Sequence, residues 1–331
     1  MWEKICDAGI NKEKISEAGA SDILICGIKM KKFKKIYIEI TNICNMSCSF
    51  CPKHKRPPKY MTATEFETVV NKTCLQGENF YLHVMGEPLS HPQFGQILDI
   101  CQKYGIQTNI TTNGTLISKS GGVIAAHDVR SVCISLHSFG ANSMNVSVQE
   151  YLEDITDFCH TMLDRKTAVE LRLWNMSRES IADKNSLNGR IIEFLSEKLS
   201  PECDISAQIC DTFFAMENNR KKNFRIKENI FLGMAEQFSW PDAKNAQGVC
   251  EGFCYGLRNQ IAILSDGTVV PCCLDSEGAV ALGNIFTQEL EDIYNSPHSR
   301  RIYDGFTNMK AVEPLCQSCG YMKKYMALRK K

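Results

Sequence analysis

The sequence predicts an α/β protein, a partial TIM-like (βα)6 barrel followed by a small α+β domain at the C-terminus. Three observations predict this class. Short apolar runs alternate with amphipathic stretches, a rhythm typical of parallel strands joined by helical crossovers. This rhythm weakens over residues 211–249, and a cysteine-rich unit containing a hairpin motif follows. An open doubly wound sheet is the alternative arrangement of the same units.

Six strands and five helices make up the predicted barrel. The strands are expected at Ile36–Ile40, Phe80–Val84, Ile106–Ile110, Val132–Leu136, Ala168–Leu173 and Ile205–Ile209. The helices between them are expected at Thr64–Leu75, Phe94–Tyr104, Leu116–His127, Tyr151–Leu163 and Leu187–Leu199. Thr62 and Glu65 have the spacing of a capping box at the start of the first helix. In both architectures an active site is expected at the carboxyl ends of the strands.

The chain is predicted to divide into three parts. Residues 1–34 form a polar, partly helical leader that ends in a basic run. Residues 35–245 form the barrel and a bridge, in which Arg225–Leu232 could be a strand. Residues 246–331 form the second unit, where two strand-like runs flank Ser265-Asp266-Gly267 and predict a β-hairpin. A short helix is expected near Gln288–Asn295.

Composition narrows the class of protein. The 331 residues include 38 Lys and Arg against 38 Asp and Glu, which disfavours a general nucleic-acid or membrane-surface binder. We find no signal-peptide pattern and no apolar span long enough to cross a membrane, so a cytoplasmic protein is expected. Seventeen cysteines in such a chain indicate metal or redox chemistry rather than disulfides.

Three cysteines directly after the first predicted strand form the most informative motif. Cys44, Cys48 and Cys51 are spaced C-x3-C-x2-C, and Phe50 precedes the last of them. Three thiolates can hold three corners of a four-iron cluster and leave the fourth iron open for binding and reduction. A zinc site is the alternative, but zinc usually takes a fourth ligand from a second close pair, and none lies nearby.

This motif resembles the signature of the radical S-adenosylmethionine (SAM) enzymes. The resemblance implies that Cys44, Cys48 and Cys51 bind a [4Fe–4S] cluster whose open iron binds SAM. One electron then cleaves SAM to methionine and a 5′-deoxyadenosyl radical, which takes a hydrogen atom from the substrate, while the protein supplies orientation. It also implies a flavodoxin- or ferredoxin-type electron donor. Lys53-His54-Lys55-Arg56 could attract an acidic donor or an anionic substrate, or could be a solvated loop.

Further segments match positions that contact SAM in that family. Met85-Gly86-Glu87-Pro88 resembles its glycine-glutamate motif, with Met85 in place of the first glycine. Gly86 would allow close backbone approach, and Glu87 would accept a hydrogen bond from the SAM amino group. Asn113, within Thr111-Thr112-Asn113-Gly114, matches a segment that lines the site; structurally it could be a simple turn.

Two single residues complete the predicted SAM site. Ser135, at the end of the fourth strand, and Arg172, in the fifth, match positions that contact the carboxylate or ribose of SAM in the family. Either could instead have a structural role. His137 stands where many relatives carry aspartate.

The second unit resembles the SPASM/twitch auxiliary domain of the same superfamily. Cys254 is followed by Gly267 and Cys272, and Cys316 and Cys319 form a later C-x2-C pair. The resemblance implies one auxiliary iron–sulfur cluster, a [4Fe–4S] cluster with these four cysteines as ligands, because no cysteine follows Cys319. A zinc ribbon is the alternative. The roles of Cys210, Cys250 and Cys273 stay open, and the remaining cysteines are expected to be small core residues.

The predicted function is radical SAM chemistry on a small molecule, such as oxidation or epimerisation of an amino sugar or cyclitol. Radical modification of a ribosomally made peptide or protein is the alternative. A metal-binding scaffold without catalysis is the non-enzymatic alternative. The substrate, the catalytic base and the oligomeric state are not predicted.

Overall fold

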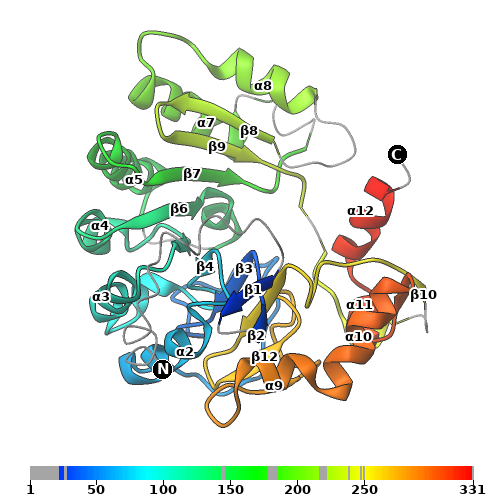
Figure 1. The fold of residues 1–331 in the computed structure, drawn as a ribbon. Coiled ribbons are helices and arrows are strands. Elements are labelled where there is room, and N and C mark those ends of the chain that lie inside the picture. The colour runs from blue at the N-terminus through cyan, green and yellow to red at the C-terminus, as the bar shows by residue number, and fades with distance from the viewer. Residues whose placement is uncertain are drawn as a thin grey trace.

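A curved sheet of ten strands forms the centre of the computed structural model, which describes residues 22–25, 28–142, 146–177, 183, 185–215, 222–237, 239–246, 248 and 250–329 (Figure 1). The strand order is β13-β12-β11-β3-β4-β5-β6-β7-β9-β8. Their bounds are β3 Lys35–Ile38, β4 Phe80–Tyr81, β5 Thr108–Thr112, β6 Val129–Ser135, β7 Ala168–Leu173, β8 Lys222–Lys227, β9 Ile230–Met234, β11 Gln260–Ile263, β12 Thr268–Val270 and β13 Gly283–Asn284.

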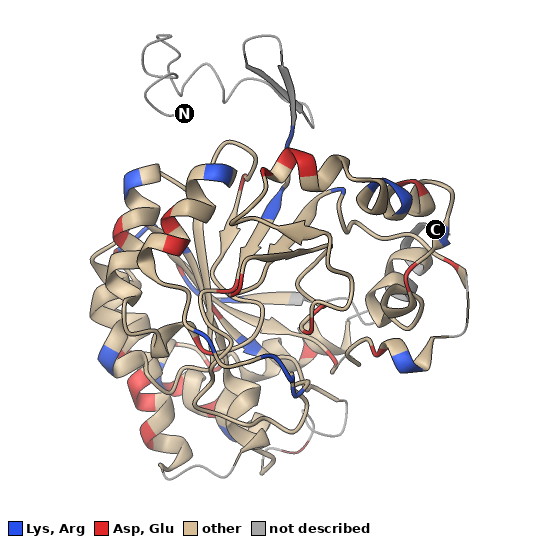
Figure 2. Ribbon diagram, turned by 90° about the horizontal axis from the view of Figure 1, so that it is seen from below, with Lys and Arg blue, Asp and Glu red and all other residues tan. Residues whose placement is uncertain are grey.

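Six of these strands run parallel to one another and form the partial barrel; they are β3, β4, β5, β6, β7 and β9. Helices cover its outer face: α2 Ala63–Thr73, α3 Phe94–Tyr104, α4 Ile117–Ala125, α5 Val148–Met162, α7 Leu187–Leu199 and α8 Ser206–Phe214 (Figures 1 and 2). In β7, Val169, Leu171 and Leu173 are fully buried on one side, while the alternate residues face the barrel interior. The predicted partial barrel is confirmed.

The first barrel helix begins at the predicted capping box. The Thr62 hydroxyl accepts a hydrogen bond from the Glu65 N–H, and the Glu65 carboxylate accepts one from the Thr62 N–H. A second capping box, formed by Ser147 and Glu150, starts α5. Each box satisfies backbone N–H groups that have no partner inside the helix.

The sixth strand lies elsewhere than predicted. Ile205–Ile209 is not a strand, because Ser206–Phe214 forms helix α8. Ile205, Ile209 and Phe213 are all buried, and their spacing of four places them on one face of a helix. The strand comes from the segment predicted as a bridge, where β9 pairs parallel with β7 and β8 closes the edge antiparallel.

The C-terminal region continues the barrel sheet. Strands β11 and β12 form the predicted hairpin around Ser265-Asp266-Gly267, and β11 pairs parallel with β3. Residues on both sides of position 246 therefore belong to one sheet. The predicted short helix is α9 Leu290–Asn295; the other elements are β10 Cys250–Glu251, α10 Pro297–Thr307, β14 Lys310–Ala311, α11 Pro314–Gln317 and α12 Gly320–Arg329.

The described part of the predicted leader is a short β-hairpin. β1 Asp22–Ile25 and β2 Ile28–Lys31 pair antiparallel, so this part is extended rather than helical. Ile23, Ile25 and Ile28 are β-branched and suit a strand. The rest of the predicted helical leader, residues 1–21, lies outside the described residues.

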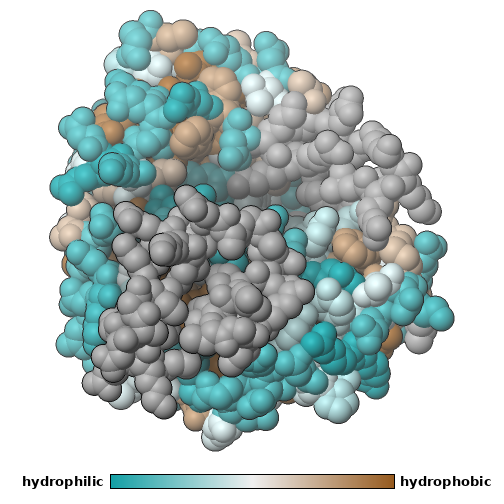
Figure 3. Space-filling model, in the orientation of Figure 1, coloured by the Kyte–Doolittle hydropathy of each residue, from teal (hydrophilic) through white to brown (hydrophobic). Residues whose placement is uncertain are grey.

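The described surface is mainly polar. Acidic and basic residues are interspersed on the outer helices (Figure 2), and hydrophilic residues dominate the described part of the face in Figure 3. Large hydrophobic residues that are exposed within the described ranges are Val146, Phe214 and Tyr255. Among the described helices, none combines the length and the apolar character that crossing a membrane requires.

Candidate functional site

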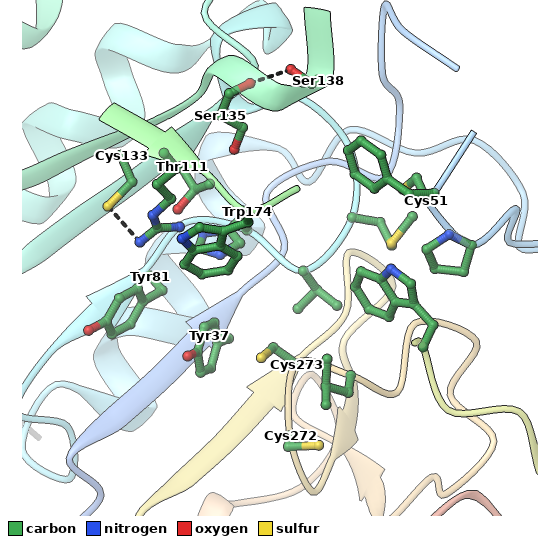
Figure 4. A pocket seen from close by; sticks show the side chains of 18 of the residues that line it. Tyr37, Cys51, Tyr81, Thr111, Cys133, Ser135, Ser138, Trp174, Cys272 and Cys273 are labelled. Carbon is green, nitrogen blue, oxygen red and sulfur yellow. Dashed lines mark hydrogen bonds between the residues drawn. The ribbon is translucent and has the colours of Figure 1, made fainter. Parts of the chain in front are cut away.

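A cavity of about 970 Å³ occupies the barrel interior and its carboxyl-terminal mouth. Both predicted cysteine sets line it: Cys44, Cys48, Cys51, Cys254, Cys272, Cys316 and Cys319. Figure 4 shows Cys51 on one side of this space, and Cys272 and Cys273 on another. The fold therefore brings together two sets of thiols that lie about 200 residues apart in sequence.

The first cysteine set lies in the loop that follows β3. The Met46 N–H lies 3.4 Å from Cys44 Sγ, and Asn142 Nδ2 donates to Cys48 Sγ at 3.1 Å. The Asn142 side chain also accepts a hydrogen bond from the Ser47 backbone at 2.8 Å, so one amide holds both the thiol and its loop. Such N–H to sulfur bonds tune the reduction potential of an iron–sulfur cluster.

Asn113 ties this loop to the end of β5. Its Nδ2 donates to the Asn45 side chain at 2.8 Å and lies 3.9 Å from Cys44 Sγ. Its backbone oxygen accepts from the Tyr151 hydroxyl at 2.7 Å. The Asn45 side chain in turn donates to Thr115. The predicted turn at 111–114 thus holds the cysteine loop through Asn113, in addition to lining the cavity.

The glycine-glutamate segment packs against the strand that leads into the cysteine loop. Gly86 has a φ of +77°, and a Cβ at this position would lie 2.3 Å from the Thr41 carbonyl oxygen and 2.9 Å from that of Ile43. The Glu87 N–H donates to the same Ile43 oxygen at 2.9 Å. Only glycine fits here without moving the backbone, which explains why the sequence keeps Gly86 although Met85 replaces the preceding glycine.

The Glu87 carboxylate is almost fully buried and accepts three hydrogen bonds. The donors are the Thr112 hydroxyl at 2.7 Å, the Asn113 N–H at 2.7 Å and the Leu89 N–H at 3.0 Å. Burial raises the pKa of Glu87, and these bonds oppose the increase. A carboxylate has about four acceptor positions, so one is left for a further donor. The predicted bond to the SAM amino group would use it.

Ser135 and Arg172 both line the cavity, but their surroundings differ. Ser135 ends β6 and faces the open space (Figure 4). The Arg172 guanidinium bonds to Glu170 at 3.1 Å on its own strand and to Cys133 Sγ at 2.8 Å on β6, and it stacks on Trp174 at 4.5 Å. Arg172 thus already has an acidic partner, and SAM would have to share the guanidinium with Glu170.

Aromatic residues form a row from the cysteine loop into the barrel. The Phe50 ring lies 5.2 Å from the ring of His137, which stacks on Trp174 at 6.4 Å. Burial lowers the pKa of His137 and so disfavours its charged form. These three rings line the cavity and provide surface for stacking.

The auxiliary cysteines are more deeply buried than the first set and come from separate segments. Cys254 precedes β11, Cys272 follows β12, and Cys316 and Cys319 lie in and after α11. Burial raises the pKa of all four thiols, that of Cys254 to about 11. The charge of Cys254 raises the pKa of both Cys272 and Cys316, and the charge of Cys316 also raises the pKa of Cys272.

The donor sets fit iron–sulfur clusters. Every cysteine in the described ranges is a free thiol. Within those ranges, no three His, Cys, Asp or Glu side chains converge on one point as a single metal ion requires. A zinc ion holds each thiolate at about 2.3 Å, whereas the thiolates of a cluster bind different irons and lie further apart. Cluster binding would deprotonate these thiols, whose pKa values burial raises.

The three cysteines whose roles the sequence left open have different surroundings. Cys273 lines the cavity and shares a hydrogen bond with the Tyr37 hydroxyl. Cys250 lies in β10, with its sulfur near the Gln317 carbonyl oxygen. Cys210 lies in α8, not at a strand end, and packs against the hydrophobic core.

Several site residues were not predicted. Trp174, Tyr37 and His83, which line the cavity, and Asn142, which bonds to the cysteine loop, belong to no predicted motif. Trp174 alone carried a sequence signal, because it directly follows the fifth predicted strand, where site residues are expected. His83 is buried among aromatic rings, and this burial lowers its pKa to about 3.

Two family models match the chain, and they match the two regions just described. Residues 38–178 match the radical SAM superfamily, and residues 254–320 match SPASM, an iron–sulfur cluster-binding domain. The chain therefore carries a radical SAM domain followed by a SPASM-type domain. Its radical SAM domain binds a [4Fe–4S] cluster and SAM, and its SPASM-type domain binds auxiliary iron–sulfur clusters.

Curated relatives are GTP 3′,8-cyclases. That of Vibrio cholerae serotype O1 is 33% identical over 100 residues, which are 28% of this chain and 30% of the relative. That of Alkaliphilus metalliredigens is 26% identical over 275 residues, 77% of this chain and 85% of the relative. The chain thus spans less than a third of the first relative.

Solved structures share the fold at low identity. SuiB of Streptococcus suis, bound to its precursor peptide SuiA, has a TM-score of 0.58 and 16% identity, covering 100% of this chain and 85% of SuiB. BtrN in complex with AdoMet and 2-DOIA has a TM-score of 0.52 and 15% identity, covering 88% of this chain and 94% of BtrN. Both likenesses support the predicted fold class.

Proposed function

We propose that the chain cleaves SAM reductively and takes a hydrogen atom from a small polar molecule, such as an amino sugar or cyclitol, to oxidise or epimerise it. The observation that carries this proposal is the single cavity lined by both cysteine sets. A substrate in this space would lie between the two iron–sulfur sites. It could then react near the first and exchange an electron with the second.

In this proposal Cys44, Cys48 and Cys51 hold the [4Fe–4S] cluster that binds SAM. The auxiliary residues Cys254, Cys272, Cys316 and Cys319 hold one further cluster, also [4Fe–4S]. When bound, the first cluster supplies the electron that cleaves SAM and so generates the 5′-deoxyadenosyl radical. The functional division is 1–34, 35–245 and 246–331, and a flavodoxin- or ferredoxin-type protein is the proposed electron donor.

The side chains of the protein hold the cysteine loop in place and orient SAM. Asn142 and Asn113 fix the cysteine loop, and Gly86 lets the backbone of its segment pass close to the chain at Thr41. Phe50 and Trp174 border the space for SAM, and Ser135 offers a hydroxyl to it. Orientation of this kind matters because a misplacement of 1 Å can lower a rate about a hundredfold.

The barrel interior supports a small polar substrate. Below the cysteine loop the cavity is lined by groups that donate or accept hydrogen bonds, which are Tyr37, Tyr81, His83, Asn109, Ser131, Glu170 and Arg172. A few convergent polar groups in a concave site are typical of small-molecule binding. A ribosomally made peptide or protein is the alternative substrate. The likeness to SuiB shows the fold alone and does not decide between them.

Anaerobic reconstitution tests the proposed chemistry. The wild-type chain is expected to hold about eight irons, as two four-iron clusters require, and to release 5′-deoxyadenosine from SAM when dithionite is added. Bound zinc, or no SAM cleavage after full iron loading, would refute the proposal. For the substrate class, deuterated amino-cyclitols and peptides are compared. Deuterium found in 5′-deoxyadenosine identifies the molecule that loses the hydrogen atom.

A further inference from the structure

A buried ion pair lies between the two cysteine sets. Glu39, directly after β3, is completely buried, and the Arg56 side chain is 10% exposed. The two groups form a bidentate pair, with Arg56 Nη2 at 2.6 Å from Glu39 Oε1 and Nη1 at 2.8 Å from Oε2. Burying two charges costs free energy that this geometry must offset, so a pair of this kind calls for an explanation.

Each member of the pair also holds a backbone segment of the site. Glu39 Oε1 accepts from the Met85 N–H at 3.1 Å, and Oε2 accepts from the Ser265 N–H at 3.0 Å. Arg56 Nε donates to the Ser276 carbonyl oxygen at 2.7 Å. All four acceptor positions of the carboxylate are therefore used.

These segments are the ones that carry the cofactor residues. Arg56 lies five residues after Cys51, and Ser276 lies four residues after Cys272. Met85 directly precedes Gly86, and Ser265 lies in the β11–β12 turn. One ion pair thus connects the first cysteine loop, the glycine-glutamate segment and the auxiliary domain.

A neighbouring contact strengthens the same connection. The Lys55 backbone N–H donates to the Glu277 carboxylate, at 2.9 Å to one oxygen and 3.2 Å to the other. Two consecutive residues after the first cysteine loop therefore bind two consecutive residues after the auxiliary cysteine Cys272. The basic run at 53–56, which could have been a solvated loop, is in part a structural junction.

We infer that Glu39 and Arg56 are positioning residues that set the distance and orientation between the two iron–sulfur sites, and with them the position of SAM. This inference rests on the proposed function, because the cysteines are assigned there. The pair contacts no thiol. It acts through the backbone segments on which the thiols are carried.

The test compares three variants of the full chain after anaerobic iron loading. R56A removes the pair, and R56K keeps the charge but cannot form the two parallel bonds and the third bond to Ser276. K59Q is the control, because Lys59 lies in the same loop as Arg56 but its side chain forms an ion pair with Glu65 of helix α2, which is outside the auxiliary domain. Iron content and the melting temperature show whether each variant is folded and loaded.

The decisive readout is the magnetic coupling between the two reduced clusters, measured by EPR with SAM present. R56A and R56K are expected to lose the single coupling value of the wild type, and to release 5′-deoxyadenosine about tenfold more slowly or worse. K59Q should match the wild type. If R56A fails to load iron, R56K decides the question.

The possible outcomes separate the inference from the proposed function. A loaded R56K, or R56A where it loads, with wild-type coupling and SAM cleavage would overturn the positioning role. The same change in K59Q would also overturn it, since the effect would then belong to the loop in general. A wild-type chain without a second cluster or without SAM cleavage would instead refute the proposed function.

Discussion

The two cysteine sets face one cavity but are built in opposite ways. Cys44, Cys48 and Cys51 fall within eight residues of one loop, and Cys44 is exposed. The auxiliary set is spread over 66 residues between a hairpin and two helices; Cys319 is buried and the other three are half-buried. The first set is therefore close together before the domain has folded, whereas the second requires folding to bring it together.

This difference has an energetic consequence. Gathering ligands that are far apart in sequence costs chain entropy, which the folded domain or the bound metal must offset. Where a metal gathers such ligands, its binding free energy becomes folding free energy. The auxiliary cluster should therefore stabilise the region that holds it. The first cluster should contribute chemistry more than stability.

Replacing one ligand from each set should give the largest effects. C48A is expected to abolish release of 5′-deoxyadenosine while leaving the melting temperature nearly unchanged, and to hold about four irons. C316A is expected to hold a similar amount of iron but to retain much of the SAM cleavage. Hydrogen exchange should then rise over residues 250–329, because the auxiliary thiols no longer cross-link their segments.

The matched control for C316A is C250S. Cys250 lies in the same region, and its sulfur lies 3.9 Å from the Gln317 carbonyl oxygen. This variant should keep both clusters and the protection of the wild type. Equal loss of SAM cleavage in C48A and C316A would contradict the separate roles of the two sets.

The glycine-glutamate segment offers a more local way to disturb the first site. G86A would place a Cβ 2.3 Å from the Thr41 oxygen at a φ of +77°, so the backbone beside the cysteine loop must move. SAM cleavage is expected to fall roughly ten- to a hundredfold. Single-turnover assays at saturating SAM, with iron content measured in parallel, check this.

G122A is the control for the added methyl group. Gly122 lies within α4, and a Cβ there would meet nothing within 4 Å. Since alanine is the better helix former, the melting temperature should rise slightly, with a gain of about 0.5–1 kcal/mol in the free energy of unfolding. A G86A enzyme as active as G122A would show that the close approach at Thr41 is not needed.

The barrel was predictable wherever burial alternates along a strand. Ala168–Leu173 has the predicted bounds because one of its faces is core and the other is cavity. The prediction of a strand at Ile205–Ile209 was wrong because two isoleucines four residues apart lie on one face of a helix and also on one face of a strand. A segment this short does not distinguish the two periods. The true sixth strand, Ile230–Met234, follows a polar edge strand that obscures the pattern.

The candidate site was predictable where its ligands are close in sequence. The cysteine spacings identify both sets, and family matches cover both regions. Asn142 and the Glu39–Arg56 pair could not be predicted, because their partners lie 17 to about 226 residues away and carry no motif. Such contacts exist only once the sheet brings β3, β6 and β11 into place.

The smallest expected effect is a shift in the reduction potential of the first cluster. N142A removes the N–H bond to Cys48 Sγ and the acceptor for the Ser47 N–H, but no iron ligand. Since N–H donors to sulfur stabilise the more negative, reduced cluster, the midpoint potential of the first cluster should become more negative. Iron content should stay at the wild-type level.

N142D sharpens this comparison. Aspartate keeps the acceptor for Ser47 but places a carboxylate where the amide donor stood, so the loop is held while the negative charge near the sulfur increases. Its potential should shift further in the negative direction than that of N142A. The auxiliary cluster should not respond in either variant, because the hydrogen bonds of the Asn142 side chain to described residues go to the first loop and Ser138. A shift confined to the auxiliary cluster would contradict this assignment, and equal shifts in both clusters would show that the two sites do not titrate independently.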